Sequence, residues 1–126
     1  MRLKIFNKLM RAWQWVKVAR LYRSERYHDF LSAVAQFEKS NTLTVYQLSM
    51  RANALLMVGR YRDALSLFSI ISGDANESGP DADYIRHYAN AMICDINGDT
   101  EAFNRISRKA SSIKVSHLVK LNLPLG

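Results

Sequence analysis

"GRYRDALSLF", residues 59–68, places a glycine, a tyrosine, a small alanine and two large apolar side chains within one short stretch. Part of this pattern occurs earlier in the chain, because Arg26, Tyr27 and Asp29 precede Arg60, Tyr61 and Asp63 by 34 residues each. Self-similarity at such a fixed period is typical of repeat architectures, in which each unit buries its apolar face against the next. The stretch therefore predicts a chain built from repeated helical units.

Composition fits one helical domain. At 126 residues and 48% hydrophobic content, residues 1–126 can bury a core without the support of a metal or a disulfide. Two prolines and five glycines leave little material for tight turns, which predicts an all-α fold. The single cysteine, Cys94, excludes an intramolecular disulfide and favours a cytoplasmic location.

Periodicity and capping residues predict where the helices lie. We expect helices near residues 3–24, 27–38, 43–58, 61–72, 82–96 and 100–111, and a short helix over 115–121 that ends before Pro124. Thr42 or Thr44 is expected to cap the third helix, and Ser78 before Pro80 to start the fifth. Residues 112–126 are expected to cover the open end of the last unit, since a repeat stack needs a cap.

The central unit resembles the tetratricopeptide repeat, a helix-turn-helix unit with the pattern W-x-x-L-G-x-x-Y followed by A-x-x-x-F. The matching positions are Leu48, Ala52, Leu55, Ala64 and Phe68. A further unit over 84–106 has Gly98 at the turn and Ala102 at the small position, whereas the first unit, about 11–37, has Glu25 and Phe30 there. The resemblance implies about three antiparallel helix-turn-helix repeats in a short right-handed stack, with extra helical segments at both ends.

No motif in the sequence indicates catalysis. His28, His87 and His117 are scattered, and there is no H-E-x-x-H, P-loop, G-x-S-x-G or Cys/His cluster at ligand spacing. We therefore expect a non-enzymatic protein with no cofactor and no metal.

The resemblance implies a groove, lined by the first helix of each unit, that binds a partner protein or peptide. By position, the groove residues are Trp15, Ala19, Tyr22, Tyr46, Ser49, Asn53, Leu56, Tyr88 and Met92. The side-chain amide of Asn53 suits the backbone of such a partner. The chain would then be an adaptor, a chaperone or a regulator. The alternative is that these residues pack against the terminal segments of the chain.

Positive charge is concentrated at the start of the chain. The formal net charge is +7, and residues 27–126 hold ten basic and ten acidic residues, so the whole imbalance lies in residues 1–26. We call these eight cations the basic patch: Arg2, Lys4, Lys8, Arg11, Lys17, Arg20, Arg23 and Arg26. Such a patch suits a nucleic acid, an anionic membrane surface or an acidic protein.

Residues 1–16 also form a basic amphipathic segment. At about 100° per residue, one helix face is apolar, and Lys4, Lys8 and Arg11 lie opposite it. The members of this apolar stripe are Ile5, Phe6, Leu9, Met10, Ala12, Trp13 and Val16. From Trp15 onward the apolar positions move to roughly the other side, so one helix contacts two surfaces or breaks near residues 14–17. The first half then protrudes or folds back.

Several interpretations of this segment are open. The preferred one packs its apolar face on the repeats and leaves the charges in solvent. The others are binding to an anionic membrane, binding to nucleic acid and self-association into a homo-oligomer. Because basic residues interrupt every apolar run in residues 1–21, we expect neither a cleaved signal peptide nor a spanning helix.

Overall fold

The computed structural model describes residues 2–125, which form seven helices and no strand. The helices are α1 (Arg2–Arg23), α2 (Tyr27–Glu38), α3 (Val45–Met57), α4 (Tyr61–Ser72), α5 (Pro80–Ile96), α6 (Thr100–Ser111) and α7 (His117–Asn122). The predicted all-α class is confirmed, and each predicted helix is found with its ends shifted by two residues at most.

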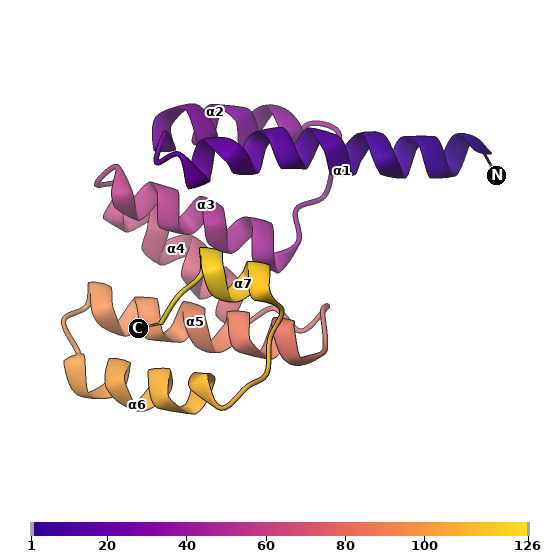
Figure 1. The fold of residues 1–126 in the computed structure, drawn as a ribbon. Helices are drawn as coiled ribbons and strands as arrows, with labels where there is room; N and C mark the ends of the chain where they lie inside the picture. Colours follow the sequence, from indigo (N-terminus) through magenta and orange to yellow (C-terminus); the bar gives the residue numbers. More distant parts are fainter. Residues whose placement is uncertain (1, 126) are drawn as a thin grey trace.

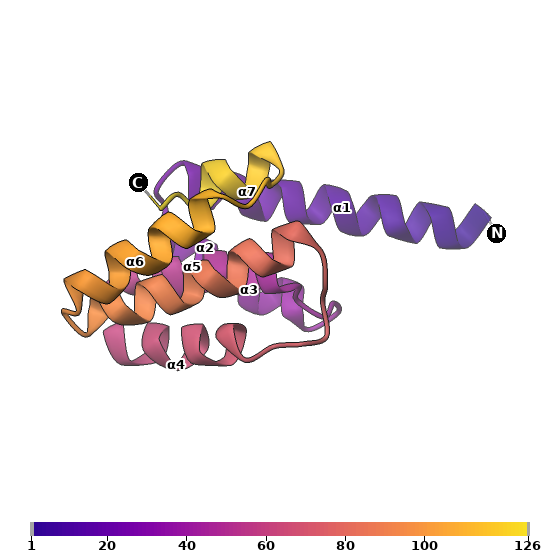
Figure 2. The same cartoon turned by 90° about the horizontal axis from the view of Figure 1, so that it is seen from below.

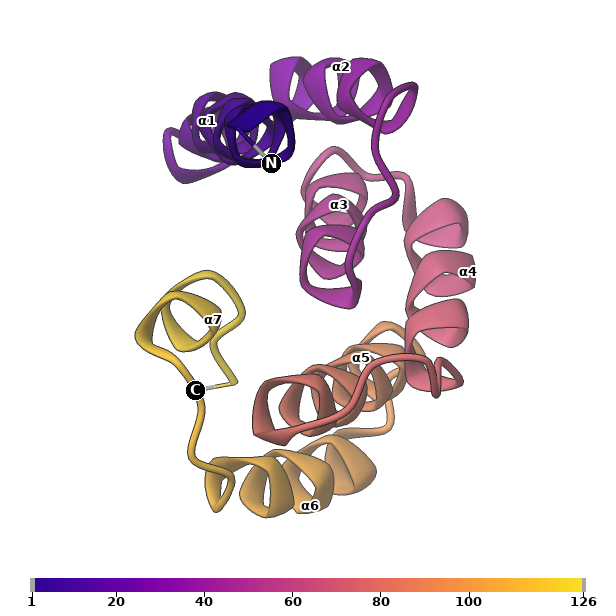
Figure 3. The same cartoon turned by 90° about the vertical axis from the view of Figure 1, so that its right-hand side faces the viewer.

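The first six helices form three consecutive hairpins, α1 with α2, α3 with α4, and α5 with α6. Neighbouring hairpins are joined by contacts of α2 with α3, α4 with α5, and α3 with α5. Figure 3 shows the helices in an open arc, with α1, α3 and α5 on its inner side and α2, α4 and α6 on its outer side. The inner side is therefore lined by the first helix of each hairpin.

A continuous apolar core runs between the two layers of the arc. Phe30, Met50, Phe68 and Ile71 are fully buried there. The small Ala52 and Ala64 are also fully buried, on the two helices of the central hairpin. Small side chains at a helix crossing let the backbones approach closely, which accounts for the alanine spacing in "GRYRDALSLF" and in the helix before it.

The same turn closes all three hairpins. Its central residue has a positive φ, 60° for Glu25, 84° for Gly59 and 78° for Gly98. In each turn a backbone N–H donates to the carbonyl five residues earlier: Arg26 to Leu21 at 2.9 Å, Arg60 to Leu55 at 2.9 Å, and Asp99 to Cys94 at 2.8 Å. This bond satisfies an otherwise orphaned carbonyl at the helix end. Glu25 thus adopts a backbone that favours glycine, and the first hairpin keeps the turn of the other two.

The starts of α3 and α5 use different local devices. Thr44 caps α3 in a reciprocal pair with Gln47, as one of the two predicted caps. The predicted start of α5 at Ser78 is wrong, because Gly79 with φ 106° is the N-cap and Pro80 is the first helical residue. A proline at this position needs no N–H partner, and the glycine before it supplies the unusual backbone angle.

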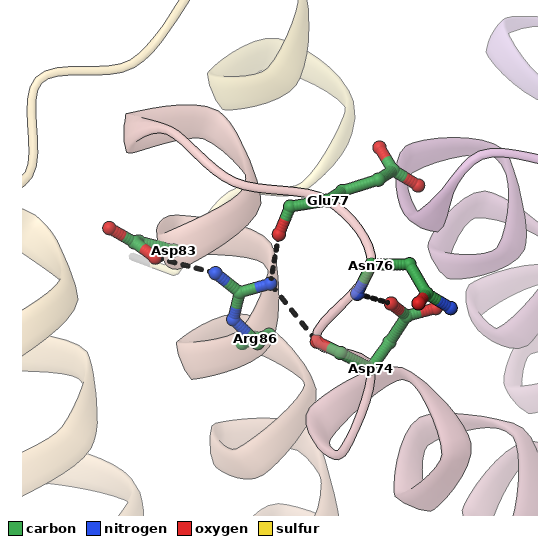
Figure 4. A network of polar contacts seen from close by, with 5 residues as sticks. All are labelled: Asp74, Asn76, Glu77, Asp83 and Arg86. Carbon is green, nitrogen blue, oxygen red and sulfur yellow. Dashed lines mark hydrogen bonds and ion pairs between the residues drawn. The ribbon is translucent and has the colours of Figure 1, made fainter.

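One arginine holds the linker between α4 and α5 (Figure 4). The Arg86 guanidinium donates to the carbonyls of Asp74 and Glu77, at 3.1 and 2.8 Å, and pairs with the Asp83 carboxylate at 2.6 Å. The Glu77 carboxylate accepts the backbone N–H of Val45 at 2.7 Å, at the start of α3. The linker therefore contacts both the helix that follows it and the central hairpin.

Candidate functional site

A polar network lies on the inner side of the arc and joins all three hairpins. Its centre is Asn53 on α3, which is almost fully buried. The Asn53 amide donates to the hydroxyl of Tyr22 on α1 at 3.1 Å, and its side-chain carbonyl accepts from the hydroxyl of Tyr88 on α5 at 2.9 Å. Both polar atoms of Asn53 are thus bonded within the chain.

The same face holds α7 and the residue that follows it. The Tyr22 hydroxyl donates to the backbone carbonyl of Asn122 at 2.9 Å, and the Asn122 amide donates to the Tyr46 hydroxyl at 2.7 Å. The Tyr84 hydroxyl on α5 donates to the backbone carbonyl of Leu123 at 2.7 Å. Leu123 is 0% exposed and Asn122 5%. Tyrosines from three inner helices therefore hold one short peptide segment.

The position of α7 differs from the expectation that residues 112–126 cover the last unit. Figure 3 shows α7 across the opening of the arc, and its hydrogen bonds reach α1, α3 and α5. Before the helix begins, the Ser116 N–H donates to the Asp81 carboxylate at 2.9 Å. The segment contacts the first hairpin as well as the last, which the sequence does not indicate.

Burial raises the pKa of the tyrosine hydroxyls above their ordinary value. Desolvation raises the pKa of Tyr22 to about 12, against a smaller lowering by the hydrogen bond from Asn53. Desolvation is also the main reason why the pKa values of Tyr46, Tyr84 and Tyr88 are raised. A neutral phenol is a hydrogen-bond donor, so the network can offer protons to backbone carbonyls throughout the neutral pH range.

The predicted groove residues separate into two groups. Tyr22, Tyr46, Asn53 and Tyr88 come together in the network. The other five lie outside this network. Ala19 and Ser49 are buried, and the Ser49 hydroxyl has no hydrogen-bond partner among residues 2–125, while Leu56 and Met92 are half-buried against the core. Trp15 packs on Phe30 and Phe37 of α2, with 6.3 and 5.4 Å between ring centroids.

Sequence reasoning missed Tyr84 and Asn122. Tyr84 lies one helical turn before Tyr88, and side chains four residues apart share a helix face, so this spacing could have identified it. No comparable signal existed for Asn122, because its partners lie 76 and 100 residues away in the chain.

The N-terminal part of α1 is a second candidate site. The helix is continuous from Arg2 to Arg23, without the break considered near residues 14–17. Figure 1 and Figure 2 show that its first half extends past the end of α2, away from the other helices. The preferred interpretation, in which the apolar stripe packs on the repeats, is wrong, because the large stripe side chains and Leu3 are 37% to 72% exposed. Since Val18 and Ala19 are buried on one side of a straight helix, the stripe on the other side faces outward.

The basic patch is unpaired along this helix. Arg26, after the helix ends, pairs with Asp29 at 2.6 Å. None of the seven cations of α1 forms a salt bridge with a carboxylate within residues 2–125. The Lys17 ammonium lies 5.5 Å from the centroid of the Trp13 ring, a weak cation–π contact on the outward face.

The part of the chain that the structure describes contains no cluster of three His, Cys, Asp or Glu side chains arranged to hold a metal ion. None of its helices combines the length and the apolar character needed to cross a membrane. Comparison of the chain with protein families, with curated proteins and with solved structures finds no match.

Proposed function

We propose that the chain is a non-enzymatic protein-interaction module, similar to tetratricopeptide repeats, whose inner face binds a peptide segment of a partner protein. The observation that supports this most directly is that the inner face holds a peptide segment of the chain itself, through Tyr22, Tyr46 and Tyr84. The three hairpin turns share a positive φ at the central residue and one hydrogen-bond pattern, which supports the likeness to a repeat stack.

The contacts define the kind of peptide that fits. Two of the three hydrogen bonds between the tyrosines and the segment involve backbone carbonyls, which any sequence provides. Specificity comes from Val119, Asn122 and Leu123, which are all buried. Asn122 lies three residues after Val119 and Leu123 lies four after it, and these two spacings place side chains on a common helix face. A partner peptide would therefore present an apolar residue, then an asparagine three residues later, then a leucine-sized residue.

Exchange of α7 for a partner segment requires that α7 can leave. It is only six residues long and is absent from the helix pairs that pack closely. Isolated helices shorter than about 12 residues are marginal in water, so α7 has little stability of its own. The chain connection gives α7 an effective concentration on the order of millimolar, against which a partner has to compete.

A synthetic peptide provides the test. A fluorescent peptide of residues 113–125 is titrated into the wild-type chain and into a Leu123→Asp variant, whose own segment carries a charge where a fully buried leucine stood. We expect the peptide to bind the variant. Its affinity for the wild-type chain should be lower by a factor of about ten or more, because the attached segment competes for the groove.

Leu121→Asp is the matched control, since Leu121 is in the same helix but 55% exposed, and this variant should behave like the wild type. Adding Tyr84→Phe to Leu123→Asp should weaken peptide binding, because the donor to the Leu123 carbonyl is lost. A folded Leu123→Asp chain that does not bind the peptide would contradict the proposed function.

A further inference from the structure

The outward face of α1 carries two features that the proposed peptide groove does not use. Along residues 3–16 the face is apolar and exposed, with Phe6 59%, Leu9 64% and Trp13 50% exposed. Soluble proteins rarely expose a contiguous apolar surface of this kind unless it binds another protein, a ligand or a membrane. The half of α1 that carries the stripe extends past the end of α2, and its large apolar side chains remain exposed within the described residues 2–125.

Three cations continue this face toward the hairpin turn. At about 100° per residue, Lys17, Arg20 and Arg23 fall in the same half of the helix surface as the apolar stripe. All three are exposed. The buried Val18 and Ala19 fall in the other half, which packs against the core. The outward face is therefore apolar for about four turns and cationic for the last two.

We propose that this face of α1 docks on the surface of an anionic lipid bilayer. The apolar side chains of residues 3–16 enter the interface between headgroups and acyl chains, and Lys17, Arg20 and Arg23 meet lipid phosphates. The helix lies in the plane of the membrane surface, as amphipathic helices rich in Lys, Arg, Trp and Phe do. The face lies on the side of α1 away from its packed residues, so this site is separate from the groove.

Charge and apolar exposure together select the bilayer over other occupants. Nucleic acid would neutralise the cations but would leave the apolar stripe in water. A second copy would cover the stripe, but the same face carries Lys17, Arg20 and Arg23 and α1 has no acidic residue to pair with them, so two such faces would repel each other. An anionic bilayer offers both partners at once, because its apolar interior can cover the stripe and its negative surface can neutralise Lys17, Arg20 and Arg23.

The two tryptophans of α1 make the proposal directly measurable. Trp13 lies on the outward face, whereas Trp15 packs against Phe37 of α2. We compare Trp15→Phe, which keeps Trp13 as reporter, with Trp13→Phe, which keeps Trp15. Vesicles of phosphatidylcholine with phosphatidylserine should shift the Trp13 emission to shorter wavelength and leave the Trp15 emission unchanged. Vesicles of phosphatidylcholine alone should give a much smaller shift.

Charge variants test the second half of the face. The triple variant Lys17→Gln, Arg20→Gln, Arg23→Gln should lower partitioning onto phosphatidylserine vesicles on the order of 100-fold, because each cation near an anionic surface contributes about fivefold. The control triple variant changes the exposed cations of α6 to glutamine, at positions Arg105, Arg108 and Lys109. It removes the same formal charge and should partition like the wild type.

Four results would overturn the proposal. The first is an unchanged Trp13 emission with phosphatidylserine vesicles, and the second is an equal loss of partitioning in both triple variants. The third is a dimer in sedimentation velocity that Leu9→Asp dissociates while vesicles do not bind, which would identify a second copy as the occupant. The fourth is salt-sensitive binding of single-stranded RNA by a chain that does not bind phosphatidylserine vesicles. Peptide binding at the groove is measured separately, so either proposal can fail alone.

Discussion

Replacing Asn53 with alanine tests the network that joins the three hairpins. The Tyr88 hydroxyl is buried and donates to Asn53, so the replacement leaves this donor without a partner. Tyr22 loses the bond from Asn53 but still donates to the Asn122 carbonyl. The two hydroxyls are therefore affected unequally.

The free-energy change follows from this inequality. An orphaned buried donor costs about 1–3 kcal/mol, and the lost bond to Tyr22 about 1 kcal/mol. We expect Asn53→Ala to lower the free energy of unfolding by about 2–4 kcal/mol. Tyr88→Phe alone should cost about 1–2 kcal/mol, because it leaves the Asn53 carbonyl unpaired. In the Asn53→Ala background the same change should be neutral or stabilising, because it removes the orphan.

Urea unfolding of the four chains, followed by circular dichroism, measures the coupling energy in a double-mutant cycle. Tyr61→Phe is a suitable control, because the Tyr61 side chain is 58% exposed and its replacement should have little effect. If Tyr88→Phe destabilises the Asn53→Ala chain as much as the wild type, the two residues are not coupled and the reasoning fails.

Four further substitutions probe the hairpin turns, Tyr22 and the linker between α4 and α5. Glu25→Gly should raise the free energy of unfolding by about 1 kcal/mol and Gly59→Ala should lower it by a similar amount, since both positions have positive φ; urea titrations that show no opposite signs would contradict this. Because the folded-state pKa of Tyr22 is raised from 10.0 to about 12, the stability that it contributes should be complete below pH 10 and lost as the pH rises through 12; Tyr22→Phe should reduce this loss in alkaline unfolding curves. Arg86→Ala should increase amide hydrogen exchange at the linker residue Glu77 while leaving the first hairpin protected, because two linker carbonyls lose their donor; unchanged exchange at Glu77 would show that Arg86 does not hold the linker.

The two proposed sites would give the protein two independent contacts. The groove lies on the inner side of the arc, which α1, α3 and α5 line (Figure 3). The exposed stripe lies on the outward face of α1. Tyr22 belongs to the groove and Arg23 to the outward face, although the two are adjacent in the chain. A chain held at a bilayer through α1 could still offer its groove to a partner peptide.

Local rules were enough to predict the helices. Periodicity locates the helices, Thr44 caps the start of α3, and Gly59 and Gly98 end α3 and α5, because these effects act over only a few residues. The 34-residue period predicted the hairpin arrangement, because a repeated sequence pattern indicates a repeated supersecondary unit. Glu25 shows the limit of such rules, because its side chain disfavours the turn that the surrounding packing enforces.

The sequence by itself determined the all-α class, the hairpin turns and the opposite placement of the two apolar faces of α1. Only the tertiary structure decided where α7 and the first half of α1 lie relative to the other helices. Tyr22 donates a hydrogen bond to Asn122, 100 residues later in the chain. The apolar stripe on the first half of α1 is left exposed within residues 2–125. Contacts at such separation depend on the curvature of the whole arc, which is the sum of many small packing angles and leaves no pattern of its own in the sequence.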